Sequence, residues 1–518
     1  MKRVLSSLLV SIGFLTMNAY ATTADHHKFP QLQQNFTSGS EVTAACLECH
    51  TEAASQIHQS PHWTWEFEAE NGETYGKRNV INNFCISIGS NEPRCTSCHA
   101  GYGYNDDSFD FSSEEAVDCL VCHDTTDTYW KFPTDAGHPN YVAKEWPKGS
   151  GNIVEPANLS DIAQSVGAPG REDCGSCHFN GGGGDAVKHG DLDSSLINPS
   201  FELDVHMSEE GANLACQDCH TTENHLTDGS RFELTAVDEH GIDIPGHHDE
   251  GRASCVSCHD DEPHTGKMAA RLNKHTDVLA CQSCHIPTFA REKATKTWWD
   301  WSAAGRLDEQ GKPIAEEDED GHHTYLSQKG EFEWTRNVVP TYAWFNGEMD
   351  YTVVGEKVEP VDGQLALTTL GGSAGDDRSR IWPFKVMQSK QPYDPVNKIM
   401  ITPHLFGKDD TSFWTNFDWR KAAATGQAVA GQPFSGEIEF LHTTYHWPIT
   451  HMVAPKEQAV ECESCHREGG RLENVGGLLL PGRDHQHWLD RVGWWLVWLS
   501  LAAVILHGFG RLITAKRK

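Results

Sequence analysis

Sixteen of the 17 cysteines in this 518-residue chain fall into eight copies of one motif, Cys-x-x-Cys-His. Two thiols at this spacing can add to the two vinyl groups of a haem, and the histidine that follows can then bind the iron. Neither a zinc ribbon nor a disulfide scaffold needs a histidine after every second cysteine. The motifs therefore predict eight covalently attached haems c.

The residues expected to hold these haems follow directly from the motifs. The attachment cysteines are Cys46, Cys49, Cys95, Cys98, Cys119, Cys122, Cys174, Cys177, Cys216, Cys219, Cys255, Cys258, Cys281, Cys284, Cys462 and Cys465. The iron ligands from the motifs are His50, His99, His123, His178, His220, His259, His285 and His466.

A second histidine is expected on most irons, because 22 of the 30 histidines lie outside the motifs and the chain has only eight methionines. Bis-histidine ligation favours low potentials. The candidates, which lie close to motifs, are His58, His62, His138, His189, His206, His225, His264, His275, His442 and His451. Histidines that occur as adjacent pairs in polar loops are not expected to bind iron; they are His26, His27, His247, His248, His322 and His323.

Two residues could turn an electron conduit into a catalyst, which needs one iron with an exchangeable or unusual ligand. Cys85 is the seventeenth cysteine and lies ten residues before Cys95. Lys131 follows the third motif, and a lysine amine can bind iron once burial or the metal lowers its pKa. From the residues alone, the favoured interpretation is an inert buried thiol for Cys85 and a solvated surface cation for Lys131.

Several segments around the motifs resemble the octahaem tetrathionate reductase family, and more distantly hydroxylamine oxidoreductase and the pentahaem nitrite reductases. These segments are Asn83-Phe84-Cys85-Ile86, Arg94-Cys95-Thr96-Ser97-Cys98-His99, Asp118-Cys119-Leu120-Val121-Cys122-His123-Asp124-Thr125-Thr126, His275-Thr276-Asp277, Ala280-Cys281-Gln282-Ser283-Cys284-His285-Ile286-Pro287, Asn337-Val338-Val339-Pro340-Thr341-Tyr342, Arg380-Ile381-Trp382-Pro383-Phe384-Lys385 and His451-Met452-Val453-Ala454-Pro455-Lys456-Glu457. The resemblance covers about residues 40–470.

The resemblance implies that the second haem is catalytic and has a lysine ligand from outside its motif. Lys131 is the first candidate for this ligand, and Lys144 is held in reserve. Cys85 and Asp127 are expected at the same site. If His99 also bound the iron, no open position would remain. Only one of the two ligands, the lysine or His99, can therefore bind the catalytic iron.

The elements that position these residues are expected to be short helices joined by long loops. The first seven motifs lie at irregular spacings within residues 22–285, in segments rich in Gly, Asp, Asn and Ser. Residues 286–461 carry no motif and are expected to wrap the haems or wall a substrate cavity, and residues 462–487 hold the eighth motif and a linker. The expected fold is mainly α with extensive loops, packed around eight haems and with little β-structure.

Both ends of the chain indicate export and anchoring. Residues 1–21 have the basic start, apolar stretch and Ala-x-Ala ending of a signal peptide. Residues 488–512 are expected to form a transmembrane helix, and the basic tail 513–518 predicts a cytoplasmic end. The body should then be periplasmic and held on the inner membrane. His485, His487 and His507 could contact a quinol or a membrane cytochrome, or be incidental to a plain anchor.

The formal charge of −33 argues against a nucleic-acid partner. The sequence favours a terminal reductase of tetrathionate, nitrite or hydroxylamine that receives electrons from a membrane quinol or membrane-bound cytochrome. Lys385 and Lys390 are candidates for attracting the anion. The alternatives are an electron conduit without chemistry of its own, and an oxidase that runs the same site in reverse. Tetrathionate itself is suggested only by the resemblance.

Overall fold

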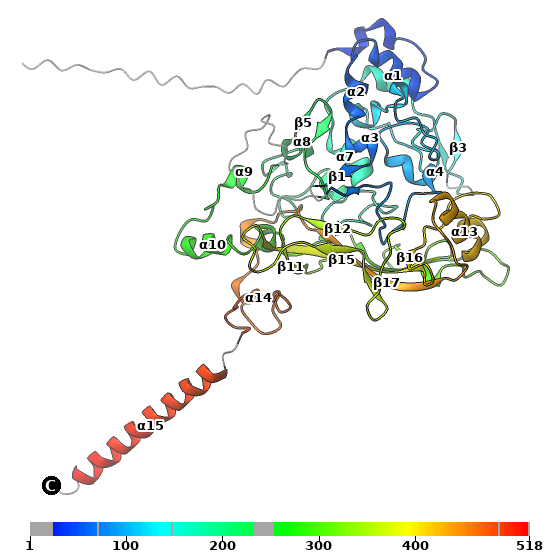
Figure 1. Ribbon diagram of the computed structural model, residues 1–518. Helices are drawn as coiled ribbons and strands as arrows, with labels where there is room; N and C mark the ends of the chain where they lie inside the picture. Colours follow the sequence, from blue (N-terminus) through cyan, green and yellow to red (C-terminus); the bar gives the residue numbers. More distant parts are fainter. Residues whose placement is uncertain (1–23, 70–71, 147–148, 233–252, 485–486, 516–518) are drawn as a thin grey trace, which may run out of the picture.

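The computed structural model describes residues 24–69, 72–146, 149–232, 253–484 and 487–515. The expected signal peptide and His485 lie outside these residues. The first half of the chain lies on one side of a large β-sheet, and a single long helix, α15, extends away from the body (Figure 1). The α-helices are α1 (Gly39–Leu47), α2 (Ala53–Ile57), α3 (Pro61–Thr64), α4 (Glu92–Cys95), α5 (Leu120–His123), α6 (Leu159–Gln164), α7 (Arg171–His178), α8 (Cys216–Cys219), α9 (Val256–His259), α10 (Ala269–His275), α11 (Gln282–His285), α12 (Phe413–Asn416), α13 (Trp419–Val429), α14 (Cys462–Cys465) and α15 (His487–Ala515).

The motifs lie on short helices, as the sequence predicts. The third to eighth motifs coincide with α5, α7, α8, α9, α11 and α14, and the first follows the last turn of α1. The second motif differs, because it is divided between α4 and a 3-10 turn, Thr96–Cys98. The two cysteines of a motif thereby project from a single helical turn, which suits attachment to one haem.

The expectation of little β-structure is not confirmed. A nine-stranded sheet has the order β13-β17-β15-β7-β10-β9-β8, and β11 and β16 also pair with β15. Its strands are β7 (Thr295–Asp300), β8 (Ala315–Glu317), β9 (His323–Leu326), β10 (Gly330–Thr335), β11 (Thr341–Phe345), β13 (Gln364–Ala366), β15 (Arg380–Asp394), β16 (Ile399–Met400) and β17 (Glu439–Pro448). Four two-stranded sheets pair β1 (Phe67–Glu68) with β2 (Thr74–Tyr75), β3 (Lys144–Glu145) with β4 (Ile153–Val154), β5 (Thr222–Glu223) with β6 (Leu226–Thr227), and β12 (Met349–Tyr351) with β14 (Thr368–Leu370).

Strands β15 and β17 are the longest pair in this sheet. They pair antiparallel over ten residues, and β15 also pairs in parallel with β7. Along β17 the side chains of Leu441, Thr443, Tyr445 and Trp447 are buried in strict alternation, which is the period of a strand with one face in the core. The sheet therefore has a continuous apolar face, which the expected fold with little β-structure did not include.

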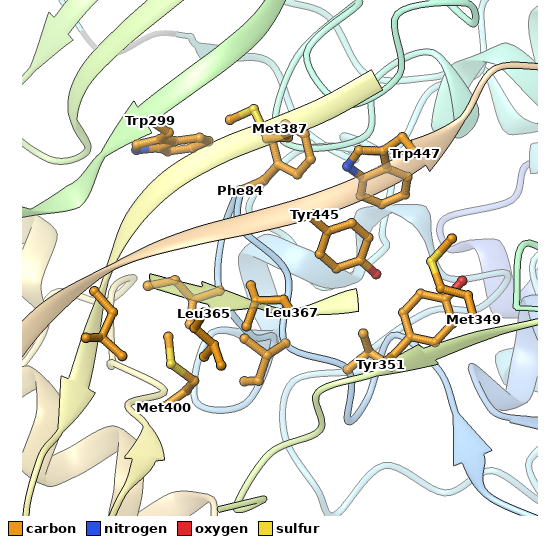
Figure 2. Packing of buried hydrophobic residues seen from close by; sticks show 14 of the residues in the cluster. Phe84, Trp299, Met349, Tyr351, Leu365, Leu367, Met387, Met400, Tyr445 and Trp447 are labelled. Carbon is orange, nitrogen blue, oxygen red and sulfur yellow. The ribbon is translucent and has the colours of Figure 1, made fainter. Parts of the chain in front are cut away.

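The largest apolar cluster joins this face to the N-terminal half of the chain. Phe84, from the segment before the second motif, packs among Trp299 of β7, Met387 of β15 and Trp447 of β17 (Figure 2). Each such aromatic side chain contributes a large buried apolar area. The sheet thus fixes the segment that carries Cys85.

Among the described residues, one helix is long and apolar enough to cross a membrane. It spans Trp488–Ala515 within α15, and no part of it is buried inside the body. Trp494, Trp495 and Trp498 lie exposed near its start, where interfacial aromatics are common.

Candidate functional site

A cavity of about 3480 Å³ runs through the body and is lined by cysteines of seven of the eight motifs. The first motif alone does not contribute cysteines to its wall. The wall is mostly apolar, but histidines from motifs and from other segments project into it. A mostly apolar cavity with convergent histidines suits haem groups, whose flat faces need apolar contact and whose irons need nitrogen ligands.

Seven histidine pairs test this fit. Two imidazoles bound to opposite sides of one metal ion, each through a bond of about 2 Å, have ring centroids about 6 Å apart. Seven motif histidines face a second histidine at centroid distances of 6.0–6.4 Å. The pairs are His50 with His26, His123 with His225, His178 with His62, His220 with His451, His259 with His206, His285 with His264, and His466 with His275.

Neighbouring oxygen atoms orient many of these rings. The Nδ1–H of His123 donates to the Gly167 carbonyl at 2.8 Å, and that of His466 donates to Pro481 at 3.0 Å. His220, His225, His264, His275 and His451 have comparable Nδ1 contacts to oxygen acceptors. A hydrogen bond at Nδ1 leaves Nε2 free for a metal and fixes the ring plane. These rings are therefore set for iron at Nε2.

The ten histidines proposed as second ligands divide into two groups. The pairs include His62, His206, His225, His264, His275 and His451. The structure places the other four against aromatic rings instead: His58 on Trp63, His138 on Tyr102, His189 on Trp447 and His442 on Trp298. His26 was not expected to bind iron, yet it faces His50 at 6.4 Å. It lies 20 residues before Cys46, and proximity to the first motif was the available signal.

Contacts between motifs connect all eight. The thiols of Cys46 and Cys119, of Cys98 and Cys177, of Cys174 and Cys216, and of Cys255 and Cys281 lie within hydrogen-bonding distance. Cys122 lies close to Cys174, Cys284 lies close to Cys465, and the N–H of Ala253 donates to Cys219 at 2.9 Å. The resulting order runs from the eighth motif through the seventh, sixth and fifth to the fourth. There it branches to the second motif and, through the third, to the first.

The second motif departs from this pattern. The N–H of His99 bonds to the carbonyl of Thr96, whereas six other motifs bond the histidine N–H to their first cysteine. The ring is 1% exposed, and its Nε2 lies 2.7 Å from the Trp63 carbonyl. Burial, helped by the Lys131 charge, lowers the pKa of His99 to about 3. Since Nε2 is occupied and no second histidine faces the ring among the described residues, His99 is not arranged as an iron ligand.

Aromatic side chains surround the displaced ring on several sides. Trp63, Trp65, Tyr104 and Phe109 lie at centroid distances of 5.0–5.3 Å from His99. These rings come from α3, from the residue after it and from the loop that follows the motif. This aromatic box of Trp63, Trp65, Tyr104 and Phe109 stabilises the neutral imidazole of His99 and disfavours the charged form.

The predicted lysine ligand, Lys131, does not line the cavity. Its Nζ lies 3.1 Å from Asp118 Oδ2 and donates to the carbonyls of His99 and Gly101. It therefore fixes the backbone that turns His99 away. Lys144 pairs with Asp135 at 2.6 Å, and Asp127 is exposed in a turn. Neither of these two candidates lines the cavity.

Besides Lys77, which donates to the Cys95 carbonyl at 3.3 Å, the structure brings Lys188 to the second motif. It lines the cavity, and its Nζ lies 4.7 Å from the ring centroid of Trp447. Burial, followed by the charges of Arg231 and Lys77, holds the pKa of its amine well below the usual value, although the nearby Cys98 thiol acts in the opposite direction. A neutral amine is the form that can bind a metal. No spacing or local pattern in the sequence distinguishes Lys188.

The sheet positions Lys188 through its backbone. The hydroxyl of Thr295, in β7, donates to the carbonyls of Ala186 and His189 at 2.6 and 3.0 Å. The Lys385 ammonium, in β15, donates to the Lys188 carbonyl at 2.9 Å and to the Thr295 hydroxyl at 2.6 Å. Lys385 is therefore part of the support for this segment, and it does not line the cavity. Two strands of the sheet thus hold the backbone of the Lys188 segment in place.

The remaining candidates, Cys85 and Lys390, differ in whether they line the cavity. Cys85 lines the cavity, with its Sγ 3.8 Å from the Gly182 carbonyl. The side chain of Asn82 accepts the N–H of Cys85 at 3.1 Å, and Trp301 donates to the Phe84 carbonyl at 3.0 Å. Lys390, by contrast, pairs with Asp300 at 3.0 Å outside the cavity. Of the two lysines proposed to attract an anion, neither faces the cavity.

Comparisons with known proteins agree with this arrangement. A family model described as bacterial cytochrome c matches residues 296–469. An uncharacterized protein of Archaeoglobus fulgidus is 27% identical over 227 residues, which are 36% of this chain and 74% of that protein. The crystal structure of an octahaem cytochrome c from Shewanella oneidensis superposes with a TM-score of 0.74 at 44% identity, over 86% of this chain and 94% of that one. This chain therefore belongs to the octahaem cytochromes c and is a redox protein that carries haem c.

Proposed function

We propose that this protein is a membrane-anchored periplasmic reductase with eight haems c, in which Lys188 binds the second iron. The observation that carries the proposal is the contrast at the second motif. Seven motif histidines face a second histidine at 6.0–6.4 Å, whereas His99 is held by the Trp63 carbonyl and Lys188 lines the cavity instead. One lysine ligand without an opposing histidine leaves a position for substrate.

The chemistry of the site follows from this ligand set. A bound haem supplies single electrons and an iron position that a small anion can occupy. Lys188 supplies a neutral amine because its burial and the nearby charges of Arg231 and Lys77 disfavour the ammonium form. The paired histidines elsewhere exclude exogenous ligands from their irons, so substrate is directed to the second motif.

The order of the motifs suggests the direction of electron flow. Pro481 accepts a hydrogen bond from His466, and only five residues separate Pro481 from the start of α15 at His487. The six Cα–Cα steps between them reach at most about 20 Å, so the eighth site stays close to the membrane that α15 would span. We expect a membrane quinol or membrane-bound cytochrome to reduce this site first. Electrons then pass through the seventh, sixth, fifth and fourth motifs to the second.

The substrate is a small sulfur or nitrogen oxyanion or uncharged hydroxylamine. Tetrathionate would accept two electrons, its central S–S bond would break, and two thiosulfate ions would leave. Nitrite or hydroxylamine would be reduced at the same position. Cys85 lies beside the site and is placed to contact the substrate.

Low-temperature EPR of the oxidised, full-length holoprotein tests the proposal, with and without nitrite and tetrathionate. We expect about one haem in eight to respond to the anions. Lys188→Met should change that signal and lower turnover at least about 100-fold, since losing even a group that orients a metal ligand costs 10- to 100-fold. Lys144→Met, at a surface ion pair, is the matched control and should leave both unchanged. Eight unresponsive low-spin haems would instead show a tethered electron conduit.

A further inference from the structure

Three glycines from a run of four, Gly181–Gly184, form part of the cavity wall next to the second motif. The three are Gly181, Gly182 and Gly183. Gly182 and Gly183 have φ of +76° and +96°, a region that favours glycine. A Cβ added to Gly181 would lie 2.8 Å from Cδ of Lys188, and one added to Gly182 would lie 2.9 Å from a methyl group of Val187. The glycines thus let Lys188 and Val187 pack closely against this backbone, which also lines the cavity.

Three functional groups surround this wall. Cys85 Sγ lies 3.8 Å from the Gly182 carbonyl. The Lys188 side chain folds over Gly181, and Lys329 Nζ lies 3.8 Å from the position of a Cβ on Gly183. The thiol, the proposed iron ligand and a second lysine thus meet around one stretch of backbone.

Lys329 is held rigidly but has no counter-charge. The backbone N–H of Lys329 donates to the Leu326 carbonyl at 2.9 Å, and the backbone carbonyl of Lys329 accepts a hydrogen bond from Trp299 Nε1 at 2.6 Å. Its Nζ lies in the cavity wall, 5.6 Å from the ring centroid of Trp414. Within the described residues, no carboxylate forms an ion pair with it. Burial lowers the pKa of the Lys329 amine, and the charge of Arg94 adds to this effect.

Arg94 is a second cation that lines the cavity, and it lies close enough to Lys329 to influence the pKa of its amine. The Arg94 side chain also donates to the Pro133 carbonyl at 3.2 Å. It too forms no ion pair with a carboxylate in the part of the chain that the structure describes. Two cations without counter-charges in a mostly apolar cavity are costly unless an anion joins them. This local excess is unusual in a chain with a formal charge of −33.

We propose that Lys329, Arg94 and the backbone at Gly182–Gly183 form a subsite that binds the terminal oxygens of an oxyanion beside Cys85. This inference rests on the proposed function and narrows its substrate class to anions, so that uncharged hydroxylamine would be bound without help from the subsite. Lys and Arg side chains bind sulfonate-like and nitrite oxygens through charge-assisted hydrogen bonds. The subsite would hold such an anion within reach of the second haem.

Lys329→Met in the oxidised, full-length holoprotein tests the subsite without turnover. We expect the dissociation constants of tetrathionate and nitrite, measured by isothermal titration calorimetry, to rise about tenfold or more. Lys329→Arg should restore part of the affinity. Lys312→Met is the matched control, because Lys312 is exposed and does not line the cavity.

Steady-state kinetics supply a second, charge-selective measurement. Lys329→Met should raise KM for nitrite about tenfold while leaving KM for hydroxylamine near the wild-type value. Equal increases for both substrates would overturn the subsite. A carboxylate of the second haem is the competing partner for Lys329. Unchanged anion affinity together with a shifted midpoint potential of that haem would assign Lys329 to this carboxylate and overturn the proposal.

The two proposals fail in distinguishable ways. Anion binding to the oxidised protein requires no catalysis. Normal anion binding that depends on Lys329, in a protein that does not reduce the anion, would count against the reductase and support the subsite. Turnover that depends on Lys188 but not on Lys329 would support the reductase and overturn the subsite.

Discussion

The second motif and the fourth motif use the same five-residue pattern and contact each other, yet they treat their histidines in opposite ways. His178 of the fourth faces His62 at 6.2 Å. His99 of the second lies in an aromatic box, with its Nε2 on the Trp63 carbonyl at 2.7 Å. The thiols of Cys98 and Cys177 lie within hydrogen-bonding distance. The motif therefore attaches a haem in both places, but the surrounding chain decides which residue binds the iron.

The paired histidines and His99 differ in which ring nitrogen forms the hydrogen bond to the protein. Many paired histidines donate Nδ1–H to a nearby oxygen and keep Nε2 for iron, as His123 and His466 do. At the second motif, Lys131 draws the carbonyls of His99 and Gly101 towards Asp118, and the 3-10 turn directs the ring to Trp63. Backbone contacts outside the motif thus give two copies of the same attachment motif different histidine environments.

Exchanging the two histidines for phenylalanine is the strongest test of this contrast. His178→Phe should remove an iron ligand and convert about one haem in eight to a high-spin state, seen in the EPR and absorption spectra. His99→Phe should leave the spin state of every haem unchanged and cost only about 1 kcal/mol of unfolding free energy through the lost hydrogen bond to Trp63. A new high-spin signal in His99→Phe would show that His99 binds iron.

The sequence predicts those parts of this site that depend on residues close together in the chain. The motifs specify the attachment cysteines because that chemistry is local, and proximity to motifs identifies six of the seven partner histidines. The choice between Lys131 and Lys188 was not accessible, because it depends on contacts between distant segments. Lys131 meets Asp118 across a loop, and Lys188 is held by Thr295 and Lys385 from two strands.

The sheet shows the same limit. The alternating pattern of Leu441, Thr443, Tyr445 and Trp447 is visible in the sequence, but the chain around it is rich in loops. Its partner β15 lies about 50 residues earlier and contains Pro383 and Pro392, residues that argue against a central strand. The strand signal was therefore present in β17 and obscured in β15.

Breaking the buried ion pair tests whether Lys131 is a structural cation rather than a ligand. Asp118→Asn should lower the free energy of unfolding by about 3–5 kcal/mol, because it leaves the Lys131 charge buried without its counter-charge. Chemical denaturation measures this loss. The double variant Lys131→Met with Asp118→Asn should recover part of it, as expected for a directly coupled pair. A double variant no more stable than Asp118→Asn would exclude that coupling.

Glu92 provides the smallest and most local test, since it is buried at the start of α4 and therefore belongs to the unusual second motif. It is 3% exposed, and Ser90 N–H donates to its carboxylate at 3.3 Å. Burial, with a contribution from Asp107, raises the pKa of Glu92 from 4.5 to about 7. The paired motifs do not share this carboxyl group, so the effect should be specific to the second site.

The sign of the pH dependence follows from that raised pKa. The protonated carboxyl stabilises the folded state fully below about pH 4.5, and this contribution is lost as the pH rises through about 7. The loss amounts to at most roughly 3 kcal/mol. Urea midpoints at pH 5 and pH 8 should therefore differ less for Glu92→Gln than for the wild type, whereas exposed Glu115→Gln should behave as wild type. If Glu92→Gln left the difference between the two pH values unchanged, the Glu92 carboxyl would be ionised at both pH values, and the second motif would tolerate a buried carboxylate that has no ion-pair partner among the described residues.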